Sequence, residues 1–248
     1  MIATRAGVAA KGFLSPEIES SRQQLRAALS PSIAEAEAVS DRVTARLFAA
    51  DVSGCDAHEI LALSLWLRAL GACQGAFLLA ERGMAAEALI LLRSGFEFVF
   101  FGAAALADPS VFESLAGGHD FERLKQARGM IREGAKGGHL SEEQIALLRE
   151  VEQEVVDAKA PLKAFRAAEI AGLGYHYESA YRGLSMMASH ATMAGTDSAL
   201  EEQPDGSAKA IFGPSERNVE FALGLARTCL ELGEAHFAPL LDKNAIRE

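Results

Sequence analysis

The stretch from Met84 to Ala107 constrains the fold more than any other part of the sequence. On a helical wheel with about 100° per residue, its large apolar side chains point in every direction. The three occupied sides hold Leu89, Leu92 and Val99, then Ile90 and Phe100, then Leu91 and Phe98. A helix that is apolar all round has to be covered all round. We therefore predict that this stretch is the central helix of the fold.

Two charged residues interrupt this apolar helix. Arg93 and Glu97 lie one turn apart on the face that also carries Ile90 and Phe100. A buried guanidinium and a buried carboxylate must be paired and further hydrogen-bonded, because burying them otherwise costs several kcal/mol. The pair is either an internal ion pair that fixes the register of the helix, or a charged pair that lines a pocket.

Local signals divide the remaining chain into further helices. Ser-Pro pairs at 15–16 and 30–31 are typical helix starts, and residues 56–59 and 141–144 have the spacing of capping boxes. Asp108-Pro109 separates two helices, the glycine pairs at 117–118 and 137–138 predict turns, and Pro161 predicts a kink. The predicted helices span 16–29, 31–50, 56–82, 84–107, 109–134, 141–171, 176–193 and 214–240.

The predicted fold class is all-α, a single-domain antiparallel helical bundle of about eight helices. No run alternates with a period of two between turn signals, so we predict no strand. The helical domain is expected to span 15–241, after a flexible N-terminus at 1–14. The long connection at 195–213 is either a lid or an ordinary flexible loop.

Composition narrows the partners and the compartment. Half of the 248 residues are hydrophobic, and the net charge of −10 disfavours non-specific binding to DNA, RNA or anionic lipid. The three cysteines, Cys55, Cys73 and Cys229, have no metal-type spacing, and we expect them to be reduced in a cytoplasmic protein.

We expect no membrane insertion. Met84–Ala107 is the membrane candidate of the sequence, but it contains Glu87, Arg93 and Glu97. Each of these charges costs about 2–3 kcal/mol near the centre of a bilayer. A core helix explains the stretch better.

A second segment concentrates polar and titratable side chains. All three tyrosines, Tyr175, Tyr177 and Tyr181, lie within seven residues and are followed by Ser185 and His190. Because Tyr177, Tyr181 and Ser185 are spaced by four, they share one helix face, which we predict to meet Arg93 and Glu97. A regular helix directs His190 to the opposite side. The alternative is that these hydroxyls bond the helix backbone and that His190 caps the helix end.

These two helices carry a resemblance to a known family. The run Leu91-Leu92-Arg93-Ser94-x-x-Glu97 and the later Tyr181-x-x-Leu184-Ser185-x4-His190-x-Thr192 are similar to the motifs of an uncharacterised all-helical bacterial family, over roughly residues 60–235. That family is a domain of unknown function and implies no reaction. The resemblance implies that Arg93, Glu97, Tyr181, Ser185 and His190 are its functional positions.

Such bundles also resemble the HEPN superfamily, many of whose members are metal-independent ribonucleases with an Arg-x(4–6)-His motif. Arg182 and His190 have seven residues between them and fall outside that pattern. Arg132 and His139 have six between them, but they bracket a glycine-rich turn. A match of this kind arises readily by chance.

No cofactor or metal is predicted. Phosphate-loop and dinucleotide fingerprints are absent, and no Cys/His cluster suits zinc. His119-Asp120 resembles the dyad of HD-type metal-dependent phosphohydrolases but lacks companion ligands in a convincing context.

The leading hypothesis is a protein that binds a small or anionic ligand between the two segments. The predicted ligand-binding residues are Arg93, Glu97, Tyr177, Tyr181, Ser185 and His190. The second hypothesis is an enzyme, a HEPN-like metal-independent ribonuclease in a defence or toxin role. A non-catalytic dimerisation or interaction module, acting as a homo-oligomer, is the third hypothesis, and an exposed apolar helix face would be its sign.

Overall fold

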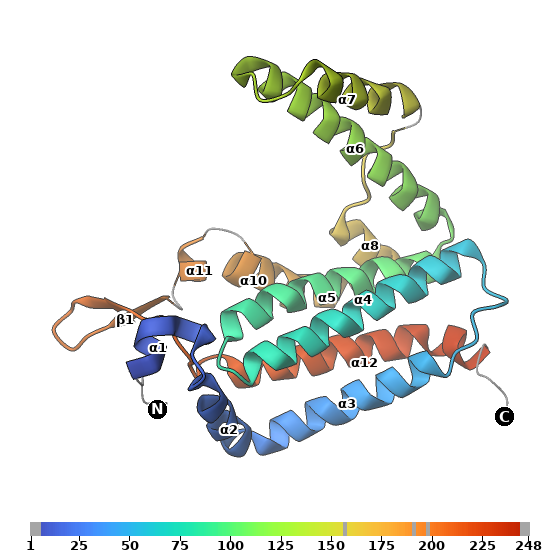
Figure 1. Cartoon of the computed structure of the whole chain (residues 1–248). Coiled ribbons are helices and arrows are strands. Elements are labelled where there is room, and N and C mark those ends of the chain that lie inside the picture. The colour runs from blue at the N-terminus through green and yellow to red at the C-terminus, as the bar shows by residue number, and fades with distance from the viewer. Residues whose placement is uncertain (1–5, 156–157, 190–191, 197–198, 244–248) are drawn as a thin grey trace.

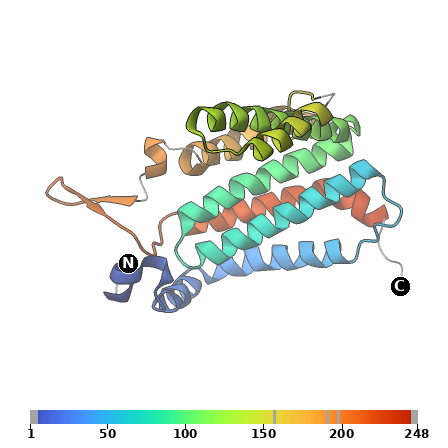
Figure 2. The same cartoon turned by 45° about the horizontal axis from the view of Figure 1, so that its top comes forward.

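Long helices packed side by side make up most of the structure, a computed structural model that describes residues 6–155, 158–189, 192–196 and 199–243. The predicted all-α bundle is confirmed. Of the four long helices in the bundle, the first three alternate in direction, whereas the fourth runs parallel to the first and the third, so the prediction of a fully antiparallel bundle is wrong (Figures 1 and 2). Its four long members are α3 (Ser30–Phe48), α4 (Ala57–Ala80), α5 (Ala85–Ala107) and α12 (Val219–Lys243).

Helix α5 lies at the centre, as predicted. It contacts α4, α12 and the short helix α8 (Ala164–Ile170). Phe96 and Phe100 are fully buried, whereas Ile90 is 44% exposed, so one sector of α5 is open rather than covered. Helices α4 and α12 meet where the Trp66 ring stacks on Phe237, with centroids 5.4 Å apart.

The N-terminal helices are fastened to the end of α4 by a buried carboxylate. Helix α2 (Ile18–Ala28) directs Arg22 and Arg26 at Glu81, with N–O distances of 2.6 and 2.7 Å. Burial alone would raise the pKa of Glu81, but the hydrogen bonds from the two arginines outweigh it and lower that pKa. Before α2, the segment that was predicted to be flexible contains the short helix α1 (Ala6–Lys11).

Helices α6 (Ser110–Gly137) and α7 (Glu142–Glu154) correct two predictions. The predicted turn at Gly117-Gly118 is wrong, because α6 continues through both glycines. A Cβ atom on Gly118 would lie 3.0 Å from Pro161, so the glycines let the returning chain cross α6 closely. The predicted helix over 141–171 is two helices, because residues between α7 and α8 form this crossing. The turn at Gly137-Gly138 and the capping box at Ser141 are confirmed.

The predicted helix over 176–193 is a series of short pieces. Two widened π turns alternate with α-helical turns, and the set consists of α9 (Gly174–His176), η2 (Tyr177–Tyr181), α10 (Arg182–Leu184), η3 (Ser185–Ser189) and α11 (Met193–Thr196). Helix α12 begins at Val219 rather than at 214, because Asn218 takes a left-handed φ of 62° just before it.

The prediction of no strand is wrong for the long connection. Strands β1 (Leu200–Glu202) and β2 (Ala208–Ala210) pair antiparallel, with Glu201 opposite Lys209. Each strand has three residues, which is too short to show a period of two in the sequence. Figure 1 shows this hairpin extending away from the bundle beside the N-terminal helices. Whether it acts as a lid stays a prediction.

Among the described residues, two helices are long and apolar enough to cross a membrane, α4 and α5. The sequence analysis named the stretch of α5 as a membrane candidate and did not name α4. In their most apolar windows, 39% of the α4 residues and 56% of the α5 residues are buried inside the fold. Core helices pass the same test of length and composition, so the finding is weak evidence for a membrane.

Two glycines of α12 give a matched test of the packing. A Cβ atom on Gly233 would collide with the Trp66 ring, whereas one on Gly224 would meet nothing within 4 Å. We expect Gly233→Ala to lower the free energy of unfolding by about 1–3 kcal/mol through overpacking. Gly224→Ala should raise it by up to about 1 kcal/mol, because alanine favours the helix. Urea denaturation of both variants measures the difference, and equal effects would contradict this packing.

Candidate functional site

The guanidinium of Arg93 joins α5 to the segment that follows α8. Its Nη1 donates to Glu97 Oε2 at 2.7 Å, its Nη2 to the hydroxyl of Tyr181 at 2.5 Å, and its Nε to the hydroxyl of Ser185 at 3.3 Å. The Tyr181 hydroxyl in turn donates to Glu97 Oε2 at 3.1 Å. The predicted meeting of the two faces is confirmed. We call Arg93, Glu97, Tyr181 and Ser185 the arginine network.

The arginine network is partly open to solvent. The side chains of Arg93 and Glu97 are 25% and 31% exposed, whereas Tyr181 is 6% exposed. The sequence left two alternatives, an internal ion pair and a charged pair that lines a pocket, and the structure places the pair at the open sector of α5. A ligand can therefore reach the guanidinium without unfolding the bundle.

The Tyr181 phenol remains protonated at neutral pH. Burial, followed by the nearby charge of Glu97, raises its pKa to about 12. A neutral phenol can accept a hydrogen bond from Arg93 and donate one to Glu97 at the same time. Tyr181 thus holds the cation and the anion in a fixed relative position.

Tyr177 supports the network through its ring. Its ring stacks on that of Tyr181 with centroids 5.2 Å apart, and it contacts Phe165 at 5.3 Å. Among the described residues, the Tyr177 hydroxyl makes no hydrogen bond. The guanidinium carbon of Arg93 lies 4.7 Å from the centroid of the Tyr181 ring, within the range of a cation–π contact.

The backbone around these side chains is irregular. Tyr181 ends the π turn η2, and Ser185 begins the π turn η3. Such widened turns are rare inside helices and occur frequently at functional sites. The hydroxyls of Ser179 and Thr192 bond backbone carbonyls of their own segment, whereas those of Tyr181 and Ser185 bond Arg93. The alternative that the hydroxyls of this segment bond its own backbone therefore applies to Ser179 and Thr192, but not to Tyr181 and Ser185.

His190, the sixth predicted ligand-binding residue, lies outside the described residues. Its predicted orientation and role stay predictions. The same holds for the ribonuclease motif formed with Arg182. Arg132 and His139, the other candidate pair, are both exposed at the far end of α6. Among the described residues, no group of three or more His, Cys, Asp or Glu side chains could hold a metal ion.

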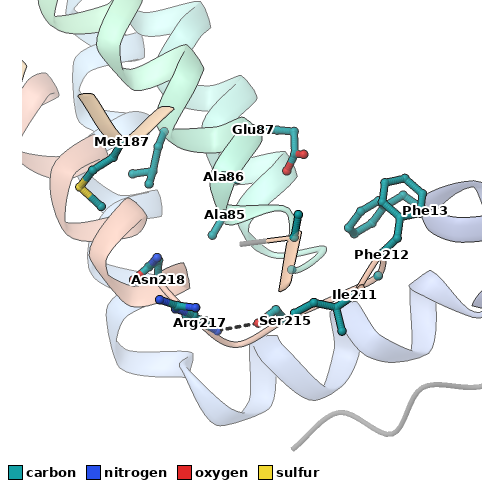
Figure 3. A pocket seen from close by; sticks show the side chains of 14 residues that line it. Phe13, Ala85, Ala86, Glu87, Met187, Ile211, Phe212, Ser215, Arg217 and Asn218 are labelled. Atoms are coloured by element: carbon teal, nitrogen blue, oxygen red, sulfur yellow. Dashed lines mark hydrogen bonds between the residues drawn. The ribbon is translucent and has the colours of Figure 1, made fainter. Parts of the chain in front are cut away.

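A cavity of about 350 Å³ lies along the same two elements. Leu89 of α5 and Met187 of η3 line it, one helical turn from Arg93 and two residues from Ser185, respectively. The opposite wall comes from Phe13 and residues 211–218. Figure 3 shows Phe13 and Phe212 together at one end and Arg217 and Asn218 near the other. None of the arginine network residues lines this cavity.

Comparison with known proteins places these features in a family. The model of a family of unknown function, DUF5677, matches residues 59–207. The chain belongs to this family. The DUF5677 match includes α5, α6, α7 and the whole arginine network, so the predicted resemblance to a family of unknown function is confirmed. No curated protein and no solved structure matches the chain significantly.

The cavity was missed by sequence reasoning. Its wall from Phe13 and residues 211–218 lies outside the DUF5677 match and far along the chain from α5. Phe13 and Phe212 meet edge to face with centroids 5.3 Å apart, a contact that no local pattern encodes. The spacing of Leu89 and Arg93 on one face of α5 was the available signal, and it does not reveal an opposite wall.

Two phenylalanine substitutions separate the hydroxyl of Tyr181 from its ring. Tyr181→Phe removes bonds to Arg93 and Glu97, and we expect it to lower the free energy of unfolding by about 1–2 kcal/mol, reduced from the usual value because both charges are partly solvated. Tyr177→Phe should change it by less than about 0.5 kcal/mol. Urea denaturation compares them. A loss in Tyr177→Phe as large as that in Tyr181→Phe would contradict the special role of the Tyr181 hydroxyl, because both variants keep the ring and only the Tyr181 hydroxyl bonds Arg93 and Glu97.

Proposed function

We propose that the protein binds a small ligand with an anionic group and an apolar part, between α5 and residues 177–189. The single observation that supports this most is the arrangement of Arg93. The guanidinium is held from three directions in a partly exposed position, one helical turn from Leu89, which lines the cavity. No reaction is part of the proposal.

The anionic group would bind the N–H donors of Arg93 that remain. A guanidinium has more N–H groups than the bonds to Ser185, Glu97 and Tyr181 use. Among the described residues, Arg93 makes no further hydrogen bond. Arginine binds carboxylate and phosphate oxygens well because its donors are planar and fixed in direction. Glu97 and Tyr181 would keep the guanidinium oriented before the ligand arrives, which reduces the entropy lost on binding.

The apolar part would occupy the cavity of Figure 3. Ala86, Leu89 and Arg93 follow one another along one face of α5, so this face leads from the cavity to the guanidinium. On the facing segment, Met187 lines the cavity and Ser185 bonds Arg93, so this segment also leads from the cavity to the guanidinium. The volume of about 350 Å³ falls within the usual range of small-molecule sites. Glu87 also lines the cavity and disfavours an anion at that end.

Thermal denaturation with defined probes tests the proposal. Hexanoate and hexyl phosphate carry the anion and an apolar chain, acetate carries the anion alone, and sodium chloride matches the ionic strength. We expect hexanoate, hexyl phosphate or both to raise the Tm more than acetate does. A ligand at about 100 times its Kd stabilises the folded state by about 2.7 kcal/mol.

Two arginine variants make the test specific. Arg182 forms an i,i+4 pair with Glu178 at 2.7 Å, the same spacing and distance as Arg93 with Glu97, but its side chain is 64% exposed. Arg93→Gln should abolish the shift caused by the probe, and Arg182→Gln should retain it. The proposal fails if neither hexanoate nor hexyl phosphate raises the Tm of the wild-type protein beyond the salt control. It also fails if these probes raise the Tm of Arg93→Gln as much as that of the wild type.

A further inference from the structure

The cavity of Figure 3 has one end that combines a negative charge with two aromatic rings. Phe13, Phe212 and Glu87 line this end, and Arg217 lies near the other end. Figure 3 shows the carboxylate of Glu87 leaving α5 on the side where the two rings lie. Glu87 is the one carboxylate among the described residues that line the cavity. We call Phe13, Phe212 and Glu87 the aromatic end.

The side chain of Glu87 makes no hydrogen bond and no ion pair with any of the described residues, although it is partly buried. Other partly buried carboxylates of the bundle do have partners. Glu97 pairs with Arg93, and Glu234 pairs with Arg42, both at 2.7 Å. A carboxylate that is withdrawn from water without a partner costs free energy. A cation bound at the aromatic end would offset that cost.

The two rings of the aromatic end are available to a ligand. They meet edge to face at an angle of 81°, and the Phe212 side chain is 74% exposed. The face of an aromatic ring carries negative charge and attracts cations, and several rings around one site bind methylated ammonium groups. The structure thus leaves an aromatic ring open to solvent at the same end of the cavity as a carboxylate without a partner.

Two glycines fix the position of Phe212. Gly12 has a left-handed φ of 55°, and a Cβ atom there would collide with the Phe212 ring. Gly83 has a φ of 76°, and its carbonyl accepts the N–H of Ser215 at 3.1 Å. A Cβ atom on Gly83 would lie 2.7 Å from the same nitrogen. Glycine adopts such φ values readily, so the segment that carries Phe212 packs directly on the backbone before α5 and near the N-terminus.

We infer that the aromatic end binds a quaternary ammonium group, in which methyl groups replace the N–H donors. A primary ammonium group has three N–H donors to satisfy, whereas a quaternary one needs only a negative charge and aromatic faces. The aromatic end supplies both. The inference rests on the proposed function in one respect, because the two share a cavity: the apolar part of the ligand then lies between its anion at Arg93 and its cation at Glu87.

Titration calorimetry with two probes of the same shape tests the inference. Choline carries the quaternary ammonium group, and its carbon analogue dimethylbutanol has an uncharged carbon atom in place of the nitrogen. We expect the wild-type protein to bind choline at least about tenfold more tightly than dimethylbutanol, because only the cation gains from the carboxylate and the ring faces. Sodium chloride keeps the ionic strength equal in both titrations.

Substitution of Glu87 has a matched control on another helix. Glu87→Gln should weaken choline binding at least about fivefold and leave dimethylbutanol binding unchanged. Glu113 also lies in the first turn of a long helix, where a carboxylate favours the helix dipole, but it does not line the cavity. Glu113 likewise makes no hydrogen bond or ion pair among the described residues. Glu113→Gln should therefore bind choline as the wild type does.

A ring substitution keeps the test decisive if Glu87→Gln loses helix content in circular dichroism. Phe212→Leu changes an exposed side chain, keeps it apolar and removes the ring, so it should weaken choline binding at least about threefold. The inference is overturned if the wild type binds choline no more tightly than dimethylbutanol. It is also overturned if Glu87→Gln and Phe212→Leu both bind choline as the wild type does.

The two proposals for this cavity fail separately. If choline binds as expected but neither hexanoate nor hexyl phosphate raises the Tm, the anion site at Arg93 is wrong and the aromatic end stands. If hexanoate or hexyl phosphate acts through Arg93 but choline binds no better than dimethylbutanol, the proposed function stands and the aromatic end is not a cation site.

Discussion

The charge of Arg93 on an otherwise apolar central helix is the constraint on which much of the structure depends. Helix α5 has to be surrounded by apolar neighbours, yet a guanidinium cannot be surrounded in this way without severe cost. The fold resolves the conflict by leaving one sector of α5 open and placing Glu97, Tyr181 and Ser185 around the charge. The segment at 177–189 is therefore fixed to the bundle by polar contacts as well as by the packing of the Tyr177 and Tyr181 rings against Phe100 of α5.

This arrangement connects the local backbone to the proposed function. The π turns at Tyr177–Tyr181 and Ser185–Ser189 widen the helix where its side chains face Arg93. Hydrogen bonds to Arg93 fix the position of this segment, and the cavity lined by Leu89 and Met187 lies beside it. Helices α6 and α7 differ from this site, because α7 has no buried residue and packs mainly on α6, so its exposure reflects missing apolar burial rather than a charge that needs partners.

Features encoded by neighbouring residues were predictable from the sequence, and features that depend on distant chain segments were not. The capping boxes at Asp56 and Ser141 act within one turn, and both helix starts were found correctly. The meeting of Tyr181 with Arg93 followed from the spacing of residues on two helix faces. Gly117-Gly118 was misread as a turn because its role is to admit the chain at Lys159 and Pro161, a contact that local sequence does not reveal. The cavity wall at Phe13 and residues 211–218 was missed for the same reason.

The most direct measurement of the central role of Arg93 is a double-mutant cycle with Arg93→Gln and Tyr181→Phe. The free energy of unfolding of the wild-type protein, the two single variants and the double variant gives the coupling between the two side chains. We predict a coupling of at least about 1 kcal/mol, because each substitution removes a bond that the other residue needs. A coupling within about 0.3 kcal/mol of zero would show that the two residues contribute independently, and it would contradict the arginine network as the connection between α5 and the segment at 177–189.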